Sequence, residues 1–516
     1  MSSASPTADR LRQRLRGLWP QTLKGQLLLA LFSGVLMVFA YEPFGQGWLA
    51  PLGWLVLWAL CDGCATPRRA ALAGFVWGIG FFAAGLGWMY VALNVYGGMA
   101  PPLAALSILL LCAYLALFTA LAGWLLLRLR SGRPVWDAGL AAAAYMLGEW
   151  LRGNLFTGLP WLMIGYTQTP PSPLSGWAPV FGVYGVSMMM VFVLALVGQT
   201  LRGRLRWPLA AAAVVTVLAG GVVLRGVVWT QPEGAPLKVA LLQTNIPQDQ
   251  KWDMARVQDW LALNADMVRQ HASSLVVLPE TTLPMFDEQL PAGYLDHLGA
   301  LARAAGGDVV LGIFTRDEQG RVFNSAISRG ASPAQHYGKN HLVPFGEFQP
   351  PGFRWFFSLA QIPMADQSRG GATQPPLQLG GQRIAMNICY EDVFGEELLH
   401  ALPEATLMLN ISNLAWYGDS HAQPQHLQIA QWRALETGRP MLRATNTGMT
   451  ALVMPDGSVS AVLPAFKRGA LEVEVQGHRG LTPYALWANG PFLTVLGGML
   501  VAAVFLRRRS SLRQGR

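Results

Sequence analysis

Three residues in the second half of this 516-residue chain have the chemistry of an acyl-transfer site. Glu280 ends the apolar run 275–279, Lys339 begins the sequence KNHLVPFGE at 339–347, and Cys389 ends another apolar run. A carboxylate can take a proton from a thiol, an ammonium group can stabilise an oxyanion, and a thiolate can carry an acyl group as a thioester. We therefore predict covalent catalysis by Cys389, with Glu280 as the general base and Lys339 as the cationic partner.

Each of these residues also has a simpler explanation when it is taken alone. A Pro-Glu pair after a strand is commonly a solvated turn, a lysine before a histidine is commonly a surface residue, and a cysteine in an apolar strand is commonly inert core. The argument for a site rests on finding all three in one region of the chain.

The region 232–485 has the pattern of an α/β domain, because charged residues are frequent in it and its apolar runs have the length of strands. Alternating strands and helices are typical of such domains, and catalytic groups collect at the carboxyl ends of their strands. Glu280 and Cys389 both stand at predicted strand ends. A helix starting at 392 would place its positive N-terminal end near Cys389 and favour the thiolate. Strands are predicted at 237–245, 273–279, 307–314, 322–329, 383–389, 405–412, 440–445 and 449–454, and helices at 253–271, 291–305, 392–402 and 421–437.

Long apolar segments occupy the first 225 residues and return near the C-terminus. The chain is 52% hydrophobic and 13% charged, against about 25% charged residues in soluble domains. We predict a membrane domain over 1–225 with about seven transmembrane helices, a C-terminal transmembrane helix over 488–506 and a basic cytoplasmic tail over 507–516. The Pro-rich stretch 159–175 is compatible with a segment that dips into the membrane. The predicted spans are 26–42, 48–63, 70–94, 103–127, 135–151, 177–199, 207–224 and 488–506.

Arginines mark alternate loops between these spans. The short loops 43–47 and 95–102 contain no lysine or arginine, so the positive-inside rule places both termini in the cytoplasm and the region 225–487 outside. The net charge of +9 follows largely from these loops. Because the arginines flank spans and form no single stripe, the charge does not favour nucleic-acid binding. The clusters are at 10–16, 68–69, 128–133, 202–206 and 507–509.

Cys389 is the only cysteine outside the apolar segments and their ends. In an outer compartment disulfides are permitted, so an unpaired thiol there indicates a chemical role. Cys61 and Cys64 form a C-x-x-C pair with no second pair nearby, which is a weak signal for a metal or redox site. Nothing in the proposed chemistry requires a metal.

In their order and local sequences, Glu280, Lys339 and Cys389 resemble the Glu-Lys-Cys triad of the nitrilase superfamily, whose fold is an α-β-β-α sandwich. With the predicted spans and the sequences at 337–347 and 443–448, nearly the whole chain resembles the apolipoprotein N-acyltransferase family. The resemblance implies a multi-pass enzyme of the bacterial inner membrane, with both termini cytoplasmic and a periplasmic nitrilase-like domain.

In that family, the resemblance implies, a phospholipid gives an acyl chain to the cysteine by ping-pong chemistry, with phosphatidylethanolamine as the typical donor. The α-amino group of a diacylglyceryl-cysteine at the N-terminus of an apolipoprotein then takes the chain. No cofactor is needed. The resemblance also implies substrate-binding or supporting roles for Trp252, Asn324, Glu347, Tyr390, Glu391, Asn413 and Trp416.

Glu347 and the aromatic segment 350–357 each leave two interpretations open, and Leu414 departs from the expected pattern. Glu347 either fixes the ammonium group of Lys339 or is an ordinary loop carboxylate. Leu414 stands where a polar residue is expected, so a side-chain role there is doubtful. The aromatic segment 350–357 either packs into the domain or faces lipid as a gate for acyl chains.

Two other functions compete with lipoprotein acylation. A membrane-tethered amidase would use the same three residues and resolve the thioester with water, although a hydrolase of soluble amides gains little from eight spans. A transporter whose outer domain binds a ligand would need ionisable residues at membrane depth. Asp62, Asp137 and Glu149 lie near the ends of their predicted spans, which disfavours transport.

Overall fold

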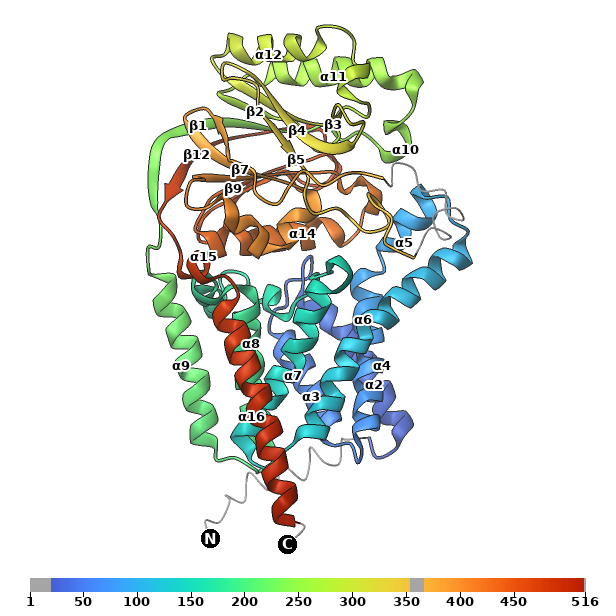
Figure 1. Ribbon diagram of the computed structural model, residues 1–516, viewed down its shortest axis with the longest axis vertical. Coiled ribbons are helices and arrows are strands. Elements are labelled where there is room, and N and C mark those ends of the chain that lie inside the picture. Colours follow the sequence, from blue (N-terminus) through green and yellow to red (C-terminus); the bar gives the residue numbers. More distant parts are fainter. Residues whose placement is uncertain (1–19, 353–365, 515–516) are drawn as a thin grey trace.

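The computed structural model describes residues 20–352 and 366–514. Figure 1 shows a helical bundle with a layered domain of sheets and helices standing on one end of it. The bundle helices run nearly parallel to its long axis, and α16 returns along it after the layered domain is complete. Their bounds are α2 (Leu23–Met37), α3 (Leu49–Asp62), α4 (Pro67–Leu86), α6 (Pro101–Leu129), α7 (Pro134–Asn154), α8 (Ala178–Leu201), α9 (Trp207–Arg225) and α16 (Gly490–Gln514).

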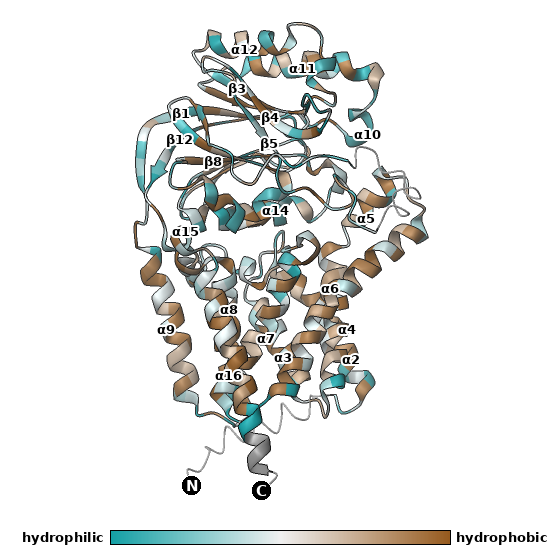
Figure 2. Ribbon diagram, viewed as in Figure 1, coloured by the Kyte–Doolittle hydropathy of each residue, from teal (hydrophilic) through white to brown (hydrophobic). Residues whose placement is uncertain are grey.

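A helix therefore lies at each of the eight ranges predicted to span the membrane. Within the described residues, six helical stretches are long and apolar enough to cross a bilayer. The six do not include α3, which has 14 residues, or α7, which contains Asp137, Glu149 and Arg152. Figure 2 shows hydrophobic residues along the whole height of the bundle. How many of the eight helices cross the membrane stays a prediction.

Close helix packing in the bundle depends on small residues. A Cβ atom on Gly74 of α4 would lie 2.3 Å from the carbonyl oxygen of Thr119 on α6. The hydroxyl of Thr119 donates a hydrogen bond of 2.8 Å to the carbonyl of Gly74. Such close backbone approach at small residues is the usual way in which helices associate in lipid.

The Pro-rich stretch predicted at 159–175 forms short turns beneath the layered domain. Two 3₁₀ turns, η4 (Ile164–Gln168) and η5 (Pro173–Trp177), follow α7, and every residue of η4 is buried. The loop also receives a hydrogen bond from the layered domain, because the hydroxyl of Tyr390 donates to the carbonyl of Gly158 at 2.9 Å. The loop after α7 is thus part of the contact between the two domains.

The layered domain contains two six-stranded sheets packed face to face. The first has the order β12-β1-β2-β3-β4-β5, and the second has the order β11-β10-β9-β8-β7-β6. Strands β1, β2 and β3 run parallel to one another, as do β7, β8 and β9. The bounds are β1 (Gln231–Gln243), β2 (Leu275–Val277), β3 (Asp308–Arg316), β4 (Val322–Gly330), β5 (His336–Gly338), β6 (Leu377–Leu379), β7 (Gln382–Ile388), β8 (Leu407–Ser412), β9 (Met441–Thr445), β10 (Ala451–Val453), β11 (Val459–Val462) and β12 (Gly469–Arg479).

Helices cover the outer faces of both sheets. In Figure 1, α11 (Val257–Gln270) and α12 (Tyr294–Ala304) lie above the first sheet, and α14 (Ala422–Thr437) lies between the second sheet and the bundle. The short helix α10 (Gln248–Lys251) follows β1, and the short helix α15 (Pro483–Trp487) lies between β12 and α16. Apolar side chains from both sheets, Leu241 and Ile388 among them, form one core between them. The predicted α-β-β-α sandwich is confirmed.

The structure corrects one predicted helix. The range 392–402 is not an α-helix but two 3₁₀ segments, η8 (Cys389–Val393) and η9 (Gly395–Ala401). They are separated because Phe394 leaves the helical region, with φ −101° and ψ 79°. Four strands were not predicted. The strands β5 and β6 have three residues each, and β11 and β12 have exposed residues that weaken the apolar signal.

Candidate active site

Cys389 stands in a strained turn at the carboxyl end of β7. Its φ is +53°, in the left-handed region that residues other than glycine rarely adopt. The turn is held by Glu391, whose carboxylate accepts a hydrogen bond from the N–H of Ile388 at 2.6 Å. Its other acceptor bonds come from the N–H groups of Asn340 (2.6 Å) and His341 (3.1 Å) and from the Tyr337 hydroxyl. Glu391 thereby joins the segment after β5 to the turn at Cys389.

A buried carboxylate and a buried ammonium group face the same region. Glu280 follows β2, and Lys339 follows β5 directly. Lys339 Nζ lies 3.4 Å from Glu280 Oε1 and 2.7 Å from Glu347 Oε1. Glu347 is therefore the nearer partner of the ammonium group. This agrees with the interpretation in which Glu347 fixes Lys339, and not with an ordinary loop carboxylate. The side chain of Lys339 is 1% exposed.

Two asparagines hold the carboxylate of Glu280. The amide of Asn324, on β4, donates to Glu280 Oε1 at 2.8 Å and to Glu347 Oε1 at 3.2 Å. The backbone N–H of Asn413, which follows β8, donates to Glu280 Oε2 at 2.7 Å. Because β8 pairs with β7, Asn413 and Cys389 leave adjacent strand ends of the second sheet. Both oxygens of Glu280 thus have donors, and the group is fixed in one orientation.

The electrostatics of the site keep the thiol protonated. Burial raises the pKa of Cys389, the charge of Glu280 raises it further, and the ammonium group of Lys339 acts in the opposite direction. A thiolate favoured by a helix N-terminus was predicted, and this is wrong, because the turn after Cys389 is a 3₁₀ segment and the net shift of the pKa is upward. A thiol with a raised pKa needs a base to remove its proton before it can act as a nucleophile.

Lys339 and Glu391 respond to burial in different ways. Burial lowers the pKa of Lys339, but Glu347 and Glu280 outweigh it, so the pKa of Lys339 is raised and the group stays cationic. Burial raises the pKa of Glu391 to about 7, although three backbone N–H groups and Lys339 oppose it. Lys339 therefore holds a lasting positive charge in this site and is not available to accept a proton.

The remaining predicted residues lie around this centre. Trp252 is 39% exposed, with its ring centroid 6.1 Å from that of Phe314. Tyr390 is buried and binds the membrane domain. The ring of Trp416 contacts Tyr96, with centroids 6.3 Å apart. Leu414 is buried and apolar. Residues 353–357 of the aromatic segment predicted as core or gate lie outside the described residues.

Sequence analysis missed a charged cluster directly behind Cys389. The carboxylate of Asp392 accepts a hydrogen bond from Arg443 Nη1 at 2.6 Å and lies 2.6 Å from His426 Nε2. Arg443 Nη2 lies 3.1 Å from His426 Nδ1, so the three groups form a closed triangle. All three are almost fully buried. The signal in the sequence was His426 inside the predicted helix 421–437 and Arg443 inside the predicted strand 440–445.

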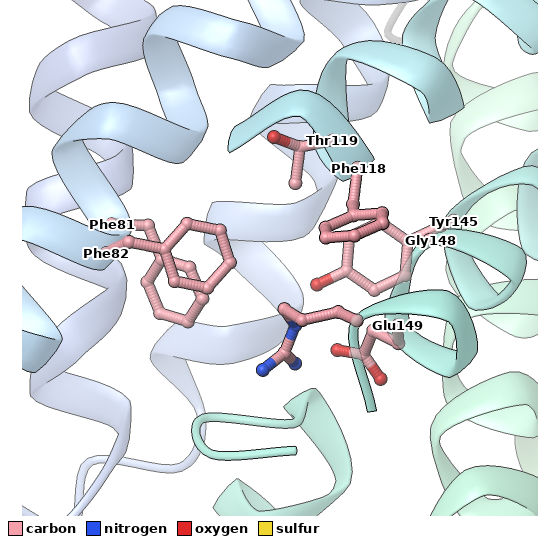
Figure 3. Close-up of a pocket in the computed structure, with 8 residues that line it drawn as sticks. Phe81, Phe82, Phe118, Thr119, Tyr145, Gly148 and Glu149 are labelled. Atoms are coloured by element: carbon pink, nitrogen blue, oxygen red, sulfur yellow. The ribbon is translucent and has the colours of Figure 1, made fainter. Parts of the chain in front are cut away.

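The loop after α7 connects the bundle to α14, the helix that carries His426. Arg152 donates hydrogen bonds to the carbonyls of Leu159, at 2.7 Å, and Trp161. Figure 3 shows a small pocket beside it, between Phe81 and Phe82 of α4 and Glu149 of α7. The indole N–H of Trp161 in turn donates to the side-chain carbonyl of Gln425 on α14 at 2.8 Å.

Known proteins match both domains. A family model of the apolipoprotein N-acyltransferase N-terminal domain matches residues 33–196, and a carbon-nitrogen hydrolase model matches residues 238–484. The chain is 45% identical to the apolipoprotein N-acyltransferase of Nitrosomonas europaea, over 94% of this chain and 99% of the relative. It is 43% identical to that of Ralstonia nicotianae, over 98% of both chains.

A match over the bundle as well as the sandwich favours acyl transfer over the tethered-amidase hypothesis, which rested on the catalytic residues alone. The apolar helices fit a multi-pass membrane protein. With the arrangement of Glu280, Lys339 and Cys389 in a nitrilase-like sandwich, the chain belongs to the apolipoprotein N-acyltransferase family.

Proposed function

We propose that Cys389 carries the acyl chain between a phospholipid donor, phosphatidylethanolamine, and the N-terminal diacylglyceryl-cysteine of an apolipoprotein. Sγ attacks the ester carbonyl carbon, and Glu280 takes the thiol proton. The oxyanion forms near Lys339, then the ester C–O bond breaks and Glu280 returns the proton to the leaving oxygen of the lysophospholipid. In the second step the α-amino nitrogen attacks the thioester carbon and Glu280 takes a proton from that nitrogen. The C–S bond then breaks, and Glu280 gives the proton to Sγ, which regenerates the thiol of Cys389.

The observation that carries this proposal is the pairing of a fixed carboxylate with a protonated thiol. Glu280 accepts from Asn324 Nδ2 at 2.8 Å and from the Asn413 N–H at 2.7 Å, so its carboxylate cannot swing away. Its charge acts on the thiol of Cys389, and burial raises the pKa of that thiol. A general base is what such a thiol lacks, and Glu280 supplies one. Lys339 remains charged between two carboxylates and supplies the stabilisation of the oxyanion.

The first step is tested by intact-protein mass spectrometry after incubation with phosphatidylethanolamine of defined acyl chains. Wild type should gain the mass of one acyl chain, on Cys389, and lose it in hydroxylamine. Cys389→Ser and Glu280→Gln should show no hydroxylamine-sensitive gain, whereas Cys112→Ser, a buried cysteine of α6, should behave as wild type. An adduct that persists in Cys389→Ser would contradict the proposal. Parallel incubations with phosphatidylglycerol identify the preferred headgroup.

We also propose that the chain lies in the bacterial inner membrane with both termini cytoplasmic and the domain 232–485 periplasmic. The membrane domain is 1–225, the last span is 488–506, and 507–516 is the tail. The arginines support this orientation, because Arg130, Arg202 and Arg204 gather around the buried Asp62 at the C-terminal end of α3. The positive-inside rule assigns such loops to the cytoplasm.

Thiol labelling tests the orientation. In a chain whose four natural cysteines are replaced, Glu318→Cys lies in the exposed turn between β3 and β4, and Arg68→Cys lies at the exposed start of α4. An impermeant maleimide should label the first in intact spheroplasts and the second only after permeabilisation. The reverse pattern would show that the predicted orientation is wrong.

A further inference from the structure

A second buried lysine lies next to Glu280. Lys251 is the last residue of the short helix α10, and its side chain is fully buried. Its Nζ donates to the hydroxyl of Thr281 at 2.8 Å and to the backbone carbonyl of Glu280 at 3.4 Å. Within the described residues, no carboxylate oxygen pairs with it inside 4.0 Å.

Burial of a lysine with only neutral hydrogen-bond partners is unfavourable. An ammonium group removed from water loses several kcal/mol of hydration unless it is paired, and lysine is among the residues least often buried. Lys339 has two carboxylates as compensation, whereas Lys251 has a hydroxyl and a carbonyl. If the side chain of Lys251 only filled space in the core, methionine would fill it without the loss of hydration that an ammonium group suffers. The ammonium group of Lys251 therefore has a specific role.

The partners of Lys251 show what that role is. Thr281 has φ +44°, a left-handed conformation that is strained for a β-branched residue. The turn is also packed tightly against β3, because a Cβ atom on Gly312 would lie 2.6 Å from the Cα of Glu280. Lys251 on α10 and Gly312 on β3 thus both contact the turn. The carboxylate of Glu280 depends on this turn for its direction.

The same short helix reaches the carboxylate by a second route. The amide of Asn413 donates to the side-chain carbonyl of Gln248, the first residue of α10, at 3.2 Å. The backbone N–H of Asn413 is one of the donors to Glu280. The segment before α10 is itself fixed, because Asn446 exchanges two hydrogen bonds of 2.9 Å with the backbone of Ile246.

We propose that Lys251 is a positioning residue for Glu280, which holds the turn at Glu280 and Thr281 and links it to the exposed Trp252. The inference rests on the proposed role of Glu280 as the base. Trp252 follows Lys251 directly and is 39% exposed. An exposed aromatic side chain therefore stands directly beside the residue that orients the base.

Electrostatics support the same assignment. Burial lowers the pKa of Lys251 to about 7, while the charges of Glu280 and Cys389 act in the opposite direction. These two are the ionisable groups that act on the amine. When Lys251 is protonated, its charge favours the thiolate of Cys389, so its removal lowers thiol reactivity more below about pH 7 than above it.

The test measures two properties of the full-length enzyme. One is the rate of acyl-enzyme formation in phosphatidylethanolamine-containing nanodiscs, and the other is the rate of Cys389 alkylation by iodoacetamide in donor-free detergent, below and above pH 7. Lys251→Met should lower the acylation kcat about tenfold or more at unchanged KM for the phospholipid, and lower the alkylation rate more below pH 7 than above it. Lys238→Met, at an exposed lysine of β1, is the matched control and should match wild type. A Lys251→Met enzyme with an acylation rate within twofold of wild type, and with the wild-type ratio of the two alkylation rates, would overturn the proposal.

A second pair of variants keeps the test decisive if Lys251→Met does not fold. Thr281→Ser keeps the hydroxyl that accepts from Lys251, and Thr281→Ala removes it. Thr281→Ala should lose several-fold in acylation rate while Thr281→Ser retains it, and equal rates would contradict the positioning role. Glu280→Gln and Cys389→Ser separate the two proposals. If either variant still gains a hydroxylamine-sensitive acyl chain, the proposed function fails. If neither does, and Lys251→Met forms the thioester at the wild-type rate, only this inference fails.

Discussion

The indole ring of Trp161, from the loop after α7, stacks on the imidazole of His426, with centroids 5.5 Å apart and planes inclined by 29°. His426 lies 2.6 Å from Asp392, three residues after Cys389. The membrane domain therefore contacts the turn at Cys389 through two rings and one carboxylate. If Cys389 is the nucleophile, as we propose, the membrane domain helps to orient it through this contact.

Loss of this stack should slow the enzyme. Trp161→Leu removes the ring contact with His426 and the hydrogen bond to Gln425, so we expect acyl-enzyme formation to fall about tenfold, because small displacements of a nucleophile are costly. Trp48→Leu, at a tryptophan that is 62% exposed, is the control for loss of an indole. Rates are measured below the unfolding temperature of each variant, and equal rates for the two variants would refute the link.

The triangle around His426 should make the fold sensitive to acid. Burial lowers the pKa of His426 from its ordinary 6.5, Asp392 opposes this, and Arg443 adds to it. A histidine with a lowered pKa contributes stability that is present above pH 6.5 and is lost as the pH falls through its folded pKa. Wild type should therefore lose more Tm below pH 6.5 than His426→Gln, which retains a donor for Asp392. Parallel Tm curves for the two proteins would contradict this.

An aspartate at position 324 should impair the enzyme more than an alanine does. Asn324 donates hydrogen bonds to both Glu280 and Glu347, so Asn324→Ala removes one donor from each carboxylate. Each lost hydrogen bond should cost about 1–3 kcal/mol of stability. Asn324→Asp places a third carboxylate against these two and should lower the acylation rate further than Asn324→Ala at pH 7. Asn154→Asp, at an exposed position, should have no effect. The hypothesis fails if the aspartate variant is the faster of the two at Asn324.

Lys251 should leave a signature in the pH dependence of stability. Its pKa is lowered from 10.5 to about 7, so the unfolded chain binds more protons between these values and the stability it contributes rises with pH over that window. The Tm of wild type relative to Lys251→Met should increase from pH 7 to pH 10. Differential scanning measurements at constant ionic strength check this, and a difference that is constant with pH would contradict burial of a titrating amine.

The fold class could be predicted because it depends on local pattern, and the same pattern drew attention to Glu280 and Cys389. Both follow apolar runs of strand length, the second interrupted by Asn387, and strand ends gather at one edge of a sheet. That the two residues act in catalysis stays a prediction. The 3₁₀ geometry after Cys389 could not be predicted, because it depends on the carboxylate of Glu391 bonding to residues 50 and 51 positions away as well as to Ile388.

Buried charge was the main feature that the sequence concealed. The segment 248–253 has the polar composition of an exposed loop, although Lys251 in it is fully buried. Helix α14 has many polar residues, among them Gln425, Gln428 and Arg433, which would suit a helix with one solvated face. Nearly all its residues are nevertheless buried, because it lies between the second sheet and the bundle. Neither periodicity nor propensity reports that a second domain covers a polar face.

The most direct test of the account is a chase of the isolated acyl-enzyme. Wild-type protein is loaded from phosphatidylethanolamine with an isotope-labelled acyl chain, freed of lipid, and mixed with a synthetic diacylglyceryl-cysteine peptide. The labelled chain should leave Cys389 and be found as an amide on the peptide α-amino group, in an amount equal to the thioester lost. A stable thioester, or release of the label as free fatty acid while the peptide stays unmodified, would contradict transfer through Cys389.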